Sequence, residues 1–330
     1  MALPELFILD VGHGNCAVLR DTGGTTVFDC APGSTLKDTL EQLGINEITH
    51  LLISHADQDH IGGLIALLNA PGITIHNVHL NPDAVKRTEV WFDLRVALRD
   101  ARATKGTRVY TSLTTEQSGL LTNGDIQLEV LAPTPELALA GVGGLDLKNR
   151  KLTSNSMSAV IRLKFEDHHL ALISGDLDAL GLENLLEGAG EIQSEILIFP
   201  HHGGNPGARN PREFAEKLCS HVKPRIVLFS ISRSRAGFPR REVIEGVMRS
   251  VPNAHVSCTQ LSEECAIDTP LKFPHLFDYP ARGKASGSCC AGTIHIPFSE
   301  GNFVDFIAEH AAFVASIAPT MCVQKVKADA

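Results

Sequence analysis

The sequence predicts a layered α/β fold. Short apolar runs typical of strands alternate with amphipathic stretches typical of helices, and the alternation occurs twice, on either side of a loop-like stretch at 133–156. The 330 residues are 43% hydrophobic and 20% charged, which is enough for a large core. This composition excludes a disordered protein and a small scaffold held together by disulfides.

In the first half, apolar or alternating runs are separated by turn residues. A hairpin is predicted at Gly23-Gly24, and Pro32-Gly33 breaks the chain after the strand that follows this hairpin. The runs predict strands over 6–11, 16–19, 25–29, 48–53, 73–80, 108–111 and 126–131, and helices over 34–43, 64–68 and 83–103.

The second half repeats this pattern after the stretch 133–156, which is rich in Gly, Pro, Ala and Asn and is predicted as a loop. Strands are predicted over 159–165, 169–173, 196–199 and 226–229, and helices over 179–187, 211–219, 240–249 and 301–317.

Charge and hydropathy exclude several classes of protein. The net charge of −9 argues against a wide basic surface that coats nucleic acid, although a small basic pocket remains compatible with it. Apolar runs are shorter than the ~18 residues that span a bilayer, so no membrane segment is expected. The N-terminus lacks the marks of a signal peptide, so we expect a cytoplasmic protein whose eight cysteines are thiols or metal ligands.

The segment from Ser54 to Gly63 carries the strongest chemical signal. It places His55, Asp57, Asp59 and His60 directly after a predicted buried strand. Imidazole and carboxylate are the usual ligands of zinc and manganese, and a loop at a strand end lets neighbouring side chains converge. The alternative, a solvated polar loop that caps a helix, accounts poorly for this density of ligands.

The pattern His55-x-Asp57-x-Asp59-His60 resembles the signature of the metallo-β-lactamase superfamily, which usually has a second histidine where this chain has Asp57. Together with the N-terminal segment 10–14 (Asp-Val-Gly-His-Gly), it is similar to the hydrolase domain of ComEC-type competence proteins. The resemblance implies a four-layered αββα sandwich. It implies a hydrolase domain over residues 1–255, and we expect 256–330 to be a C-terminal extension packed on the same body.

Two later segments match the same family. Asp176 follows a strand in the sequence Ser-Gly-Asp, and the resemblance implies that it bridges two metal ions. His201 and His202 match a His-His-Gly segment, and one of them is expected to bind the second metal, with the choice left open. Asn155 stands where other members place a histidine ligand, so it lines either the metals or the substrate, or is a plain turn residue.

The chain also departs from the family pattern. Where relatives often have Gly-His-Pro, this sequence reads Gly237-Phe238-Pro239, and His13 replaces the more usual glutamine. These changes leave the predicted metal ligands in place but bear on the identity of the substrate. His13 is interpreted either as a residue near the site or as a structural histidine.

The ligand set implies a mechanism. The predicted ligands are His55, Asp57, Asp59, His60, Asp176 and the pair His201 and His202, which would hold two divalent ions, Zn²⁺ or Mn²⁺. Such a pair activates a water for hydrolysis. The residues predicted to take part in catalysis are Asp57, Asp59 and His202, with one of the two aspartates orienting the water.

A basic stretch favours a phosphodiester substrate, possibly DNA. Arg233, Arg235 and Arg240 are predicted to bind phosphate oxygens through charge-assisted bonds, whereas arginines that only solubilise a helix start are the alternative. The rival functions are hydrolysis of a lactone, thioester or lactam on the same scaffold, and a weakly catalytic subunit that acts with an unidentified protein partner.

A cysteine cluster near the C-terminus is a candidate structural zinc site. It comprises Cys258, Cys265, Cys289 and Cys290. The spacing is irregular and adjacent cysteines rarely bind one zinc, so buried small apolar residues are an equal alternative.

Overall fold

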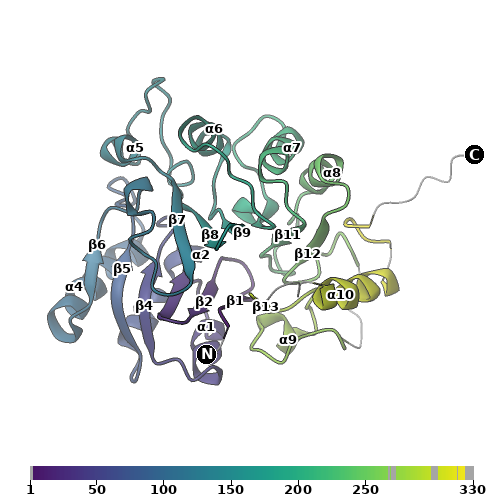
Figure 1. The fold of residues 1–330 in the computed structure, drawn as a ribbon, viewed down its shortest axis with the longest axis horizontal. Coiled ribbons are helices and arrows are strands. Elements are labelled where there is room, and N and C mark those ends of the chain that lie inside the picture. Colours follow the sequence, from purple (N-terminus) through teal and green to yellow (C-terminus); the bar gives the residue numbers. More distant parts are fainter. Residues whose placement is uncertain (1–2, 267, 269–272, 299–303, 318, 324–330) are drawn as a thin grey trace, which may run out of the picture.

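The computed structural model describes residues 3–266, 268, 273–298, 304–317 and 319–323. Two mixed β-sheets form the centre of the molecule (Figure 1). The first has seven strands in the order β13-β1-β2-β3-β4-β5-β6, and the second has six in the order β12-β11-β10-β9-β8-β7. Helices cover the outer face of each sheet, which places the sheets back to back.

The first sheet is antiparallel from β13 to β3 and parallel from β3 to β6. Its parallel half lets the carboxyl ends of β3 and β4 point toward the same edge. The strands are β1 (Glu5–Ile8), β2 (Ala17–Asp21), β3 (Gly24–Phe28), β4 (Glu47–Leu52), β5 (Thr74–His79), β6 (Arg108–Tyr110) and β13 (Ile294–Pro297).

The second sheet begins with an antiparallel meander and continues as a parallel set from β9 to β12. Its parallel strands likewise end at one edge. The strands are β7 (Ile126–Ala132), β8 (Val160–Phe165), β9 (His168–Ile173), β10 (Ile196–Ile198), β11 (Ile226–Phe229) and β12 (His255–Cys258).

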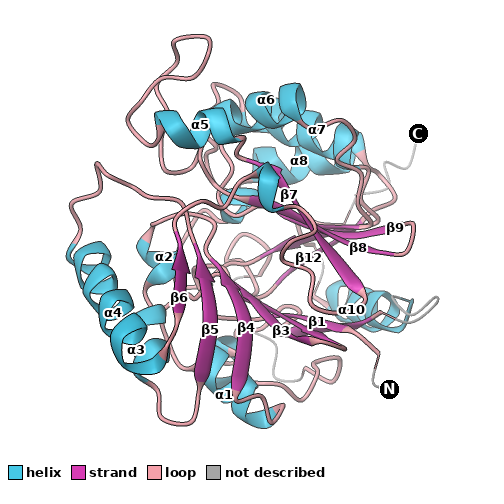
Figure 2. Cartoon of the chain, turned by 60° about the vertical axis from the view of Figure 1, so that its left-hand side comes forward, coloured by secondary structure: helices cyan, strands magenta, loops and turns pink. Residues whose placement is uncertain are grey.

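Figure 2 shows the helices on both outer sides of the two sheets, and this arrangement confirms the predicted four-layered αββα sandwich. One helical layer holds α1 (Thr35–Gln42), α2 (Gln58–Ile61), α3 (Leu64–Asn69) and α4 (Glu89–Lys105). The other side holds α5 (Pro135–Ala140), α6 (Ala179–Gly188), α7 (Pro211–Val222) and α8 (Arg241–Ser250), while α9 (Arg282–Ser286) and α10 (Val304–Ser316) follow near the C-terminus.

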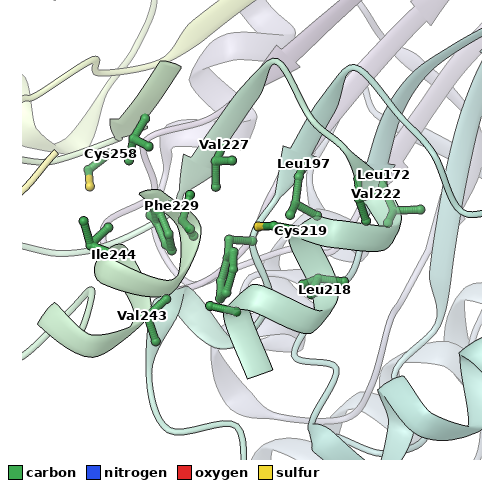
Figure 3. Packing of buried hydrophobic residues seen from close by; sticks show 14 of the residues in the cluster. Leu172, Leu197, Leu218, Cys219, Val222, Val227, Phe229, Val243, Ile244 and Cys258 are labelled. Carbon is green, nitrogen blue, oxygen red and sulfur yellow. The ribbon is translucent and has the colours of Figure 1, made fainter. Parts of the chain in front are cut away.

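Among the described residues, three large apolar cores and one small cluster hold these layers together. Of the large cores, one lies between the sheets, one between the first sheet and α1–α4, and one between the second sheet and α6–α8. In the last, Leu218 of α7, Val243 of α8 and Phe229 of β11 belong to one buried cluster (Figure 3). Burying each such side chain contributes about 1.5–3 kcal/mol, so the sandwich is held mainly by apolar burial.

The structure corrects several predicted elements. The helix predicted over 83–103 begins only at Glu89, because Pro82 precedes a turn in which Asp83 accepts a hydrogen bond from the backbone N–H of Lys86. The stretch predicted as a loop at 133–156 contains α5, and the strands β12 and β13 were not predicted. The C-terminal helix is α10, and residues 301–303 of its predicted range lie outside the described residues.

The C-terminal part of the chain contributes to the sandwich. Strand β13 pairs with β1 along Glu5–Ile8, and β12 pairs with β11. The predicted boundary between 255 and 256 falls inside β12, and the division into two parts stays a prediction. Within the described residues, every helix is too short or too polar to cross a lipid bilayer.

We expect stability to depend on pH through His79. Its ring nitrogen lies 3.1 Å from that of His50, and burial lowers the pKa of His79 to about 4. The unfolded chain, with a histidine pKa of about 6.5, takes up a proton that the folded chain resists. The free energy of unfolding should therefore fall as the pH drops from about 6.5 to 4.

In His79→Phe, which can keep the ring contact with Tyr110, this pH dependence should weaken in urea titrations of the metal-free protein. His76→Phe, at an exposed position on the same strand, is the control. An unchanged slope in His79→Phe would exclude this role for His79.

Candidate metal centre

The candidate site lies where strand ends from both sheets meet. Asp29 follows β3 and His55 follows β4 in the first sheet, whereas Asp176 follows β9 and Ser230 follows β11 in the second. The carboxyl ends of parallel strands are the usual position of binding sites in α/β sheets, because the loops there converge.

The four ligand candidates in the segment after β4 differ in burial. His55 and His60 are buried, while the side chains of Asp57 and Asp59 are 34% and 25% exposed. Helix α2 begins after Asp57, which turns His60 inward, and the carbonyl of His60 accepts a hydrogen bond from the backbone N–H of Cys30 at 2.7 Å.

A glycine allows Asp176 to approach the first sheet. Gly175 has a φ of 51°, and a Cβ there would lie 2.6 Å from Oγ of Ser158 and 2.7 Å from Cβ of Ser54. The backbone N–H of Asp176 donates to Ser158 Oγ at 3.0 Å. This tight junction positions the carboxylate of Asp176 between the sheets.

His201 and His202 follow β10 in a strained conformation. Both have positive φ values, 53° and 55°, which is unusual for residues with a Cβ. Strain of this kind persists where surrounding contacts hold it and is frequent at functional sites. It turns the two rings toward Asp176 from adjacent positions in the chain.

Four side chains form a compact set of ligand atoms. One atom each from Asp59, His60, Asp176 and His202 lies within 4.8 Å of the other three. Nε2 of His60 is 3.1 Å from Oδ1 of Asp176, and Nε2 of His202 is 3.3 Å from Oδ2 of Asp59. We call these four residues the second metal position.

A neighbouring group shares Asp176. Nε2 of His55 lies 3.8 Å from Oδ2 of Asp57 and 3.9 Å from Oδ2 of Asp176. Asn155 is close by, with its amide nitrogen 3.1 Å from Nδ1 of His201. We refer to His55, Asp57 and the second oxygen of Asp176, which are predicted ligands of another ion, as the first metal position.

Hydrogen bonds orient three of the imidazoles. Nδ1 of His60 lies 2.7 Å from Oδ2 of Asp29, and Nδ1 of His202 lies 2.8 Å from the carbonyl oxygen of Ser230. Nδ1 of His55 contacts the hydroxyls of Ser54 and Ser158. A nitrogen that donates to an oxygen leaves the other ring nitrogen with a free lone pair, which is how histidine ligands are oriented toward metals.

The inward-facing atoms lack hydrogen-bond partners. Nε2 of His55, His60 and His202 and Oδ1 of Asp176 are all buried without one. Leaving a single buried polar atom unpaired costs about 1–3 kcal/mol. Bound divalent metal would satisfy such atoms, so the donor set fits a metal site.

The electrostatics of the pocket also favour a cation. Burial alone would raise the pKa of Asp176, but His60 and His202 hold it well below its usual range. The pKa of Asp59 is also low despite burial, because His13 and His202 contact its carboxylate. Burial and the neighbouring His60 lower the pKa of His55 to about 4, so its ring is neutral at pH 7 and able to bind a metal.

The structure thus brings the predicted ligands together in one place. His202 belongs to the compact set, whereas His201 is 28% exposed and places Nδ1 3.2 Å from Oδ2 of Asp176. This geometry favours His202 as the metal ligand, whereas His201 contacts the carboxylate of Asp176. The individual ligand roles stay predictions.

Sequence reasoning missed several residues of the site. Asp29 and Ser230 orient His60 and His202, and Lys86 forms an ion pair with Asp57. For Asp29 the sequence predicted only a strand and a turn. The residues around Lys86 form no pattern that would indicate a role at the site. His13, left open above, lies beside the site, with its ring 4.3 Å from that of His202.

The three predicted substrate arginines have different surroundings. The guanidinium of Arg235 lies 5.6 Å from the ring centre of Phe238, which contacts His13. Arg233 donates to the carbonyls of Leu261 and Ala266 and so supports the C-terminal segment. The backbone N–H of Arg240 donates to the carbonyl of Gly203, and its side chain pairs with Glu242. The substrate-binding roles of the three arginines stay predictions.

The predicted four-cysteine zinc site does not form among the described residues. The side chain of Cys289 faces Asp10, with Sγ 3.7 Å from its carboxylate, whereas Sγ of Cys290 lies 3.2 Å from Nε2 of His310. The side chains of these two neighbouring cysteines therefore point in different directions. Burial raises the pKa of Cys258 and Cys290.

We expect His202→Gln and His201→Gln to differ in metal affinity. Loss of the buried Nε2 of His202 should weaken binding of Zn²⁺ or Mn²⁺ by about a hundredfold or more, and loss of His201 by about tenfold or less. Equilibrium dialysis with metal analysis measures both. Equal losses in the two variants would show that His202 has no special position.

Asp29→Asn tests the orientation of His60. The amide keeps the size of the side chain but removes the charge that fixes the ring, so metal affinity should fall about 10–100-fold. Asp21→Asn, at a carboxylate that bonds the backbone of residues 125 and 126 away from the site, is the control. If both variants bind metal as the wild type does, the proposed role of Asp29 is wrong.

Comparisons with known proteins agree with this geometry. The family model of the metallo-beta-lactamase superfamily matches residues 9–208. ComE operon protein 3 of Bacillus subtilis is 23% identical over 270 residues, which is 74% of this chain and 30% of that protein. Competence protein ComA of Neisseria gonorrhoeae is 24% identical over 213 residues, 62% of this chain and 25% of that protein. The chain thus spans less than a third of the length of these relatives.

Solved structures show similarity at low identity. The metallo-beta-lactamase fold protein YhfI of Bacillus subtilis is 11% identical with a TM-score of 0.47, covering 77% of this chain and 96% of that one. Zinc-bound PqqB of Methylobacterium extorquens is 10% identical with a TM-score of 0.49, covering 75% and 96%. On the matched family model, and with its candidate site for a divalent metal, this chain belongs to the metallo-beta-lactamase superfamily.

Proposed function

We propose that the protein is a dinuclear metal-dependent hydrolase that cleaves phosphodiesters in DNA or nucleotides. The observation that carries this proposal is the group of buried Nε2 atoms of His55, His60 and His202 around Asp176, all without a hydrogen-bond partner. They are accompanied at the same edge of the sheets by two cationic side chains, Lys86 and Arg235.

Zn²⁺ and Mn²⁺ are the metals that we propose. Imidazole suits zinc, while the extra carboxylate of Asp57 in place of a histidine favours a harder ion such as manganese. When bound, such ions lower the pKa of water and stabilise negative charge on the group under attack.

The side chains of the chain have distinct roles in this proposal. Asp59 is partly exposed and lies 3.2 Å from Nε2 of His13, so it is placed to accept a hydrogen bond from the attacking water. Asp29 holds His60 at Nδ1, which leaves its Nε2 facing Asp176. The ring of His202 is held by Ser230, and this leaves its Nε2 facing Asp59.

Charge near the site supports an anionic substrate. The guanidinium of Arg235 stacks over Phe238 and is held at the side of His13, where it can reach a phosphate oxygen. Lys86 lies at another part of the site, where it forms an ion pair with Asp57. A lactone, thioester or lactam carries no phosphate charge and would gain little from these cations.

The cytoplasm is the compartment that we propose. All eight cysteines are free thiols, and six of them are buried. Reduced cysteines are typical of proteins kept in a reducing compartment. A protein partner stays a prediction from the sequence.

The proposal is tested by hydrolysis assays with the metal-loaded protein. Bis-p-nitrophenyl phosphate and single-stranded DNA should be cleaved in the presence of Mn²⁺ or Zn²⁺, and Asp59→Ala should reduce the rate by about a hundredfold or more. Full metal loading without turnover of either substrate would favour the weakly catalytic scaffold instead.

Charge reversal separates phosphodiester from ester hydrolysis. Arg235→Glu should lower kcat/KM for DNA by about tenfold or more, because the carboxylate repels phosphate, while hydrolysis of a neutral lactone should change little. Arg225→Glu is the matched control, since this exposed arginine lies at the opposite end of β11. Efficient lactone hydrolysis with no DNA cleavage would overturn the phosphodiesterase assignment.

A further inference from the structure

The loop between β5 and α4 brings a lysine to the candidate metal centre. The ammonium of Lys86 forms an ion pair with Oδ1 of Asp57, whose other oxygen faces His55. The side chain of Lys86 is only 17% exposed. It is therefore held at the first metal position and is not a solvated surface lysine.

Hydrogen bonds to the buried carboxylate of Asp83 fix this loop in place. The backbone N–H of Lys86 donates to Oδ1 of Asp83 at 3.0 Å, and Ser154 donates its hydroxyl to Oδ2 of the same carboxylate at 2.5 Å. Asp83 is 3% exposed. The loop is thus tied to the segment that carries Asn155, on the same side of the site.

The two metal positions differ in the ligands available to them. At the second position, four ligand atoms lie within 4.8 Å of one another and three of them lack hydrogen-bond partners. At the first position, Asp57 already has a cationic partner, and Asn155 offers only a neutral amide. A dication that enters here must share Asp57 with an ammonium group, and two like charges a few ångströms apart repel each other.

We propose that Lys86 is a built-in cation that competes with metal for Asp57 and makes the two positions unequal. The second position, at Asp59, His60, Asp176 and His202, fills first and tightly. The first position fills only at higher metal concentration and exchanges its ion readily. This inference rests on the metal-binding part of the proposed function and is independent of the substrate.

Metal titration of the complete, metal-free chain tests the inference. In calorimetry with Mn²⁺, the wild type should bind one equivalent tightly and a second at least about tenfold more weakly. Lys86→Met removes the ammonium, so the second equivalent should bind about tenfold more tightly while the first changes less than about twofold. Lys86→Arg keeps the charge and should retain the two-step behaviour.

The spin coupling of Mn²⁺ pairs provides a second readout without any activity assay. Electron paramagnetic resonance at one equivalent should show isolated ions in the wild type and a larger coupled fraction in Lys86→Met. Lys217→Met, at an exposed lysine on α7, is the matched control and should behave as the wild type. Lys86→Gln replaces Lys86→Met if the latter fails to fold.

The outcomes separate the two proposals. Two equal binding steps in the wild type, or steps that are the same in wild type and Lys86→Met, would overturn the role of Lys86 and leave the hydrolase proposal intact. A wild type that binds neither Mn²⁺ nor Zn²⁺ would overturn both. Tighter second-site binding in Lys86→Met, together with no phosphodiester cleavage by the metal-loaded wild type, would support the inference and count against the proposed substrate.

Discussion

The buried carboxylate of Asp176 is the constraint on which the rest of the site depends. Removing a carboxylate from water is costly unless cations or hydrogen bonds compensate for the loss. Here the imidazoles of His60, His201 and His202 surround it, and a metal ion would complete the compensation. Its two oxygens face different groups of ligands, so one side chain connects both metal positions.

The sandwich makes this arrangement possible because each sheet supplies part of the site. The first sheet provides His55 and His60, and the second provides Asp176 and His202, with an apolar core between the sheets holding the two groups in register. A metal site needs its ligand atoms placed to within about half an ångström. Rigid strand ends meet that requirement better than free loops, and the bonds from Asp29 and Ser230 restrict the rings further.

Much of the site could be predicted because its ligands follow strands in dense clusters. His55, Asp57, Asp59 and His60 lie within six positions, and their chemistry is evident without a structure. Lys86 could not be predicted in the same way, because it reaches Asp57 only through a turn fixed by Asp83 and Ser154, 71 positions apart. The two arginines of the basic stretch show the same limit, because Arg233 donates to the carbonyl of Leu261 whereas Arg235 lies over the ring of Phe238.

The sequence by itself determined the alternation of strands and helices and the types of ligand, since apolar periodicity and residue chemistry are local properties. Only the tertiary structure decided that His202, and not His201, joins the compact set of ligands, because a backbone turn with positive φ directs the two rings differently. It also decided that Cys289 and Cys290 face different partners and that β13 pairs with β1. Such outcomes depend on contacts between residues far apart in the chain, which no local pattern encodes.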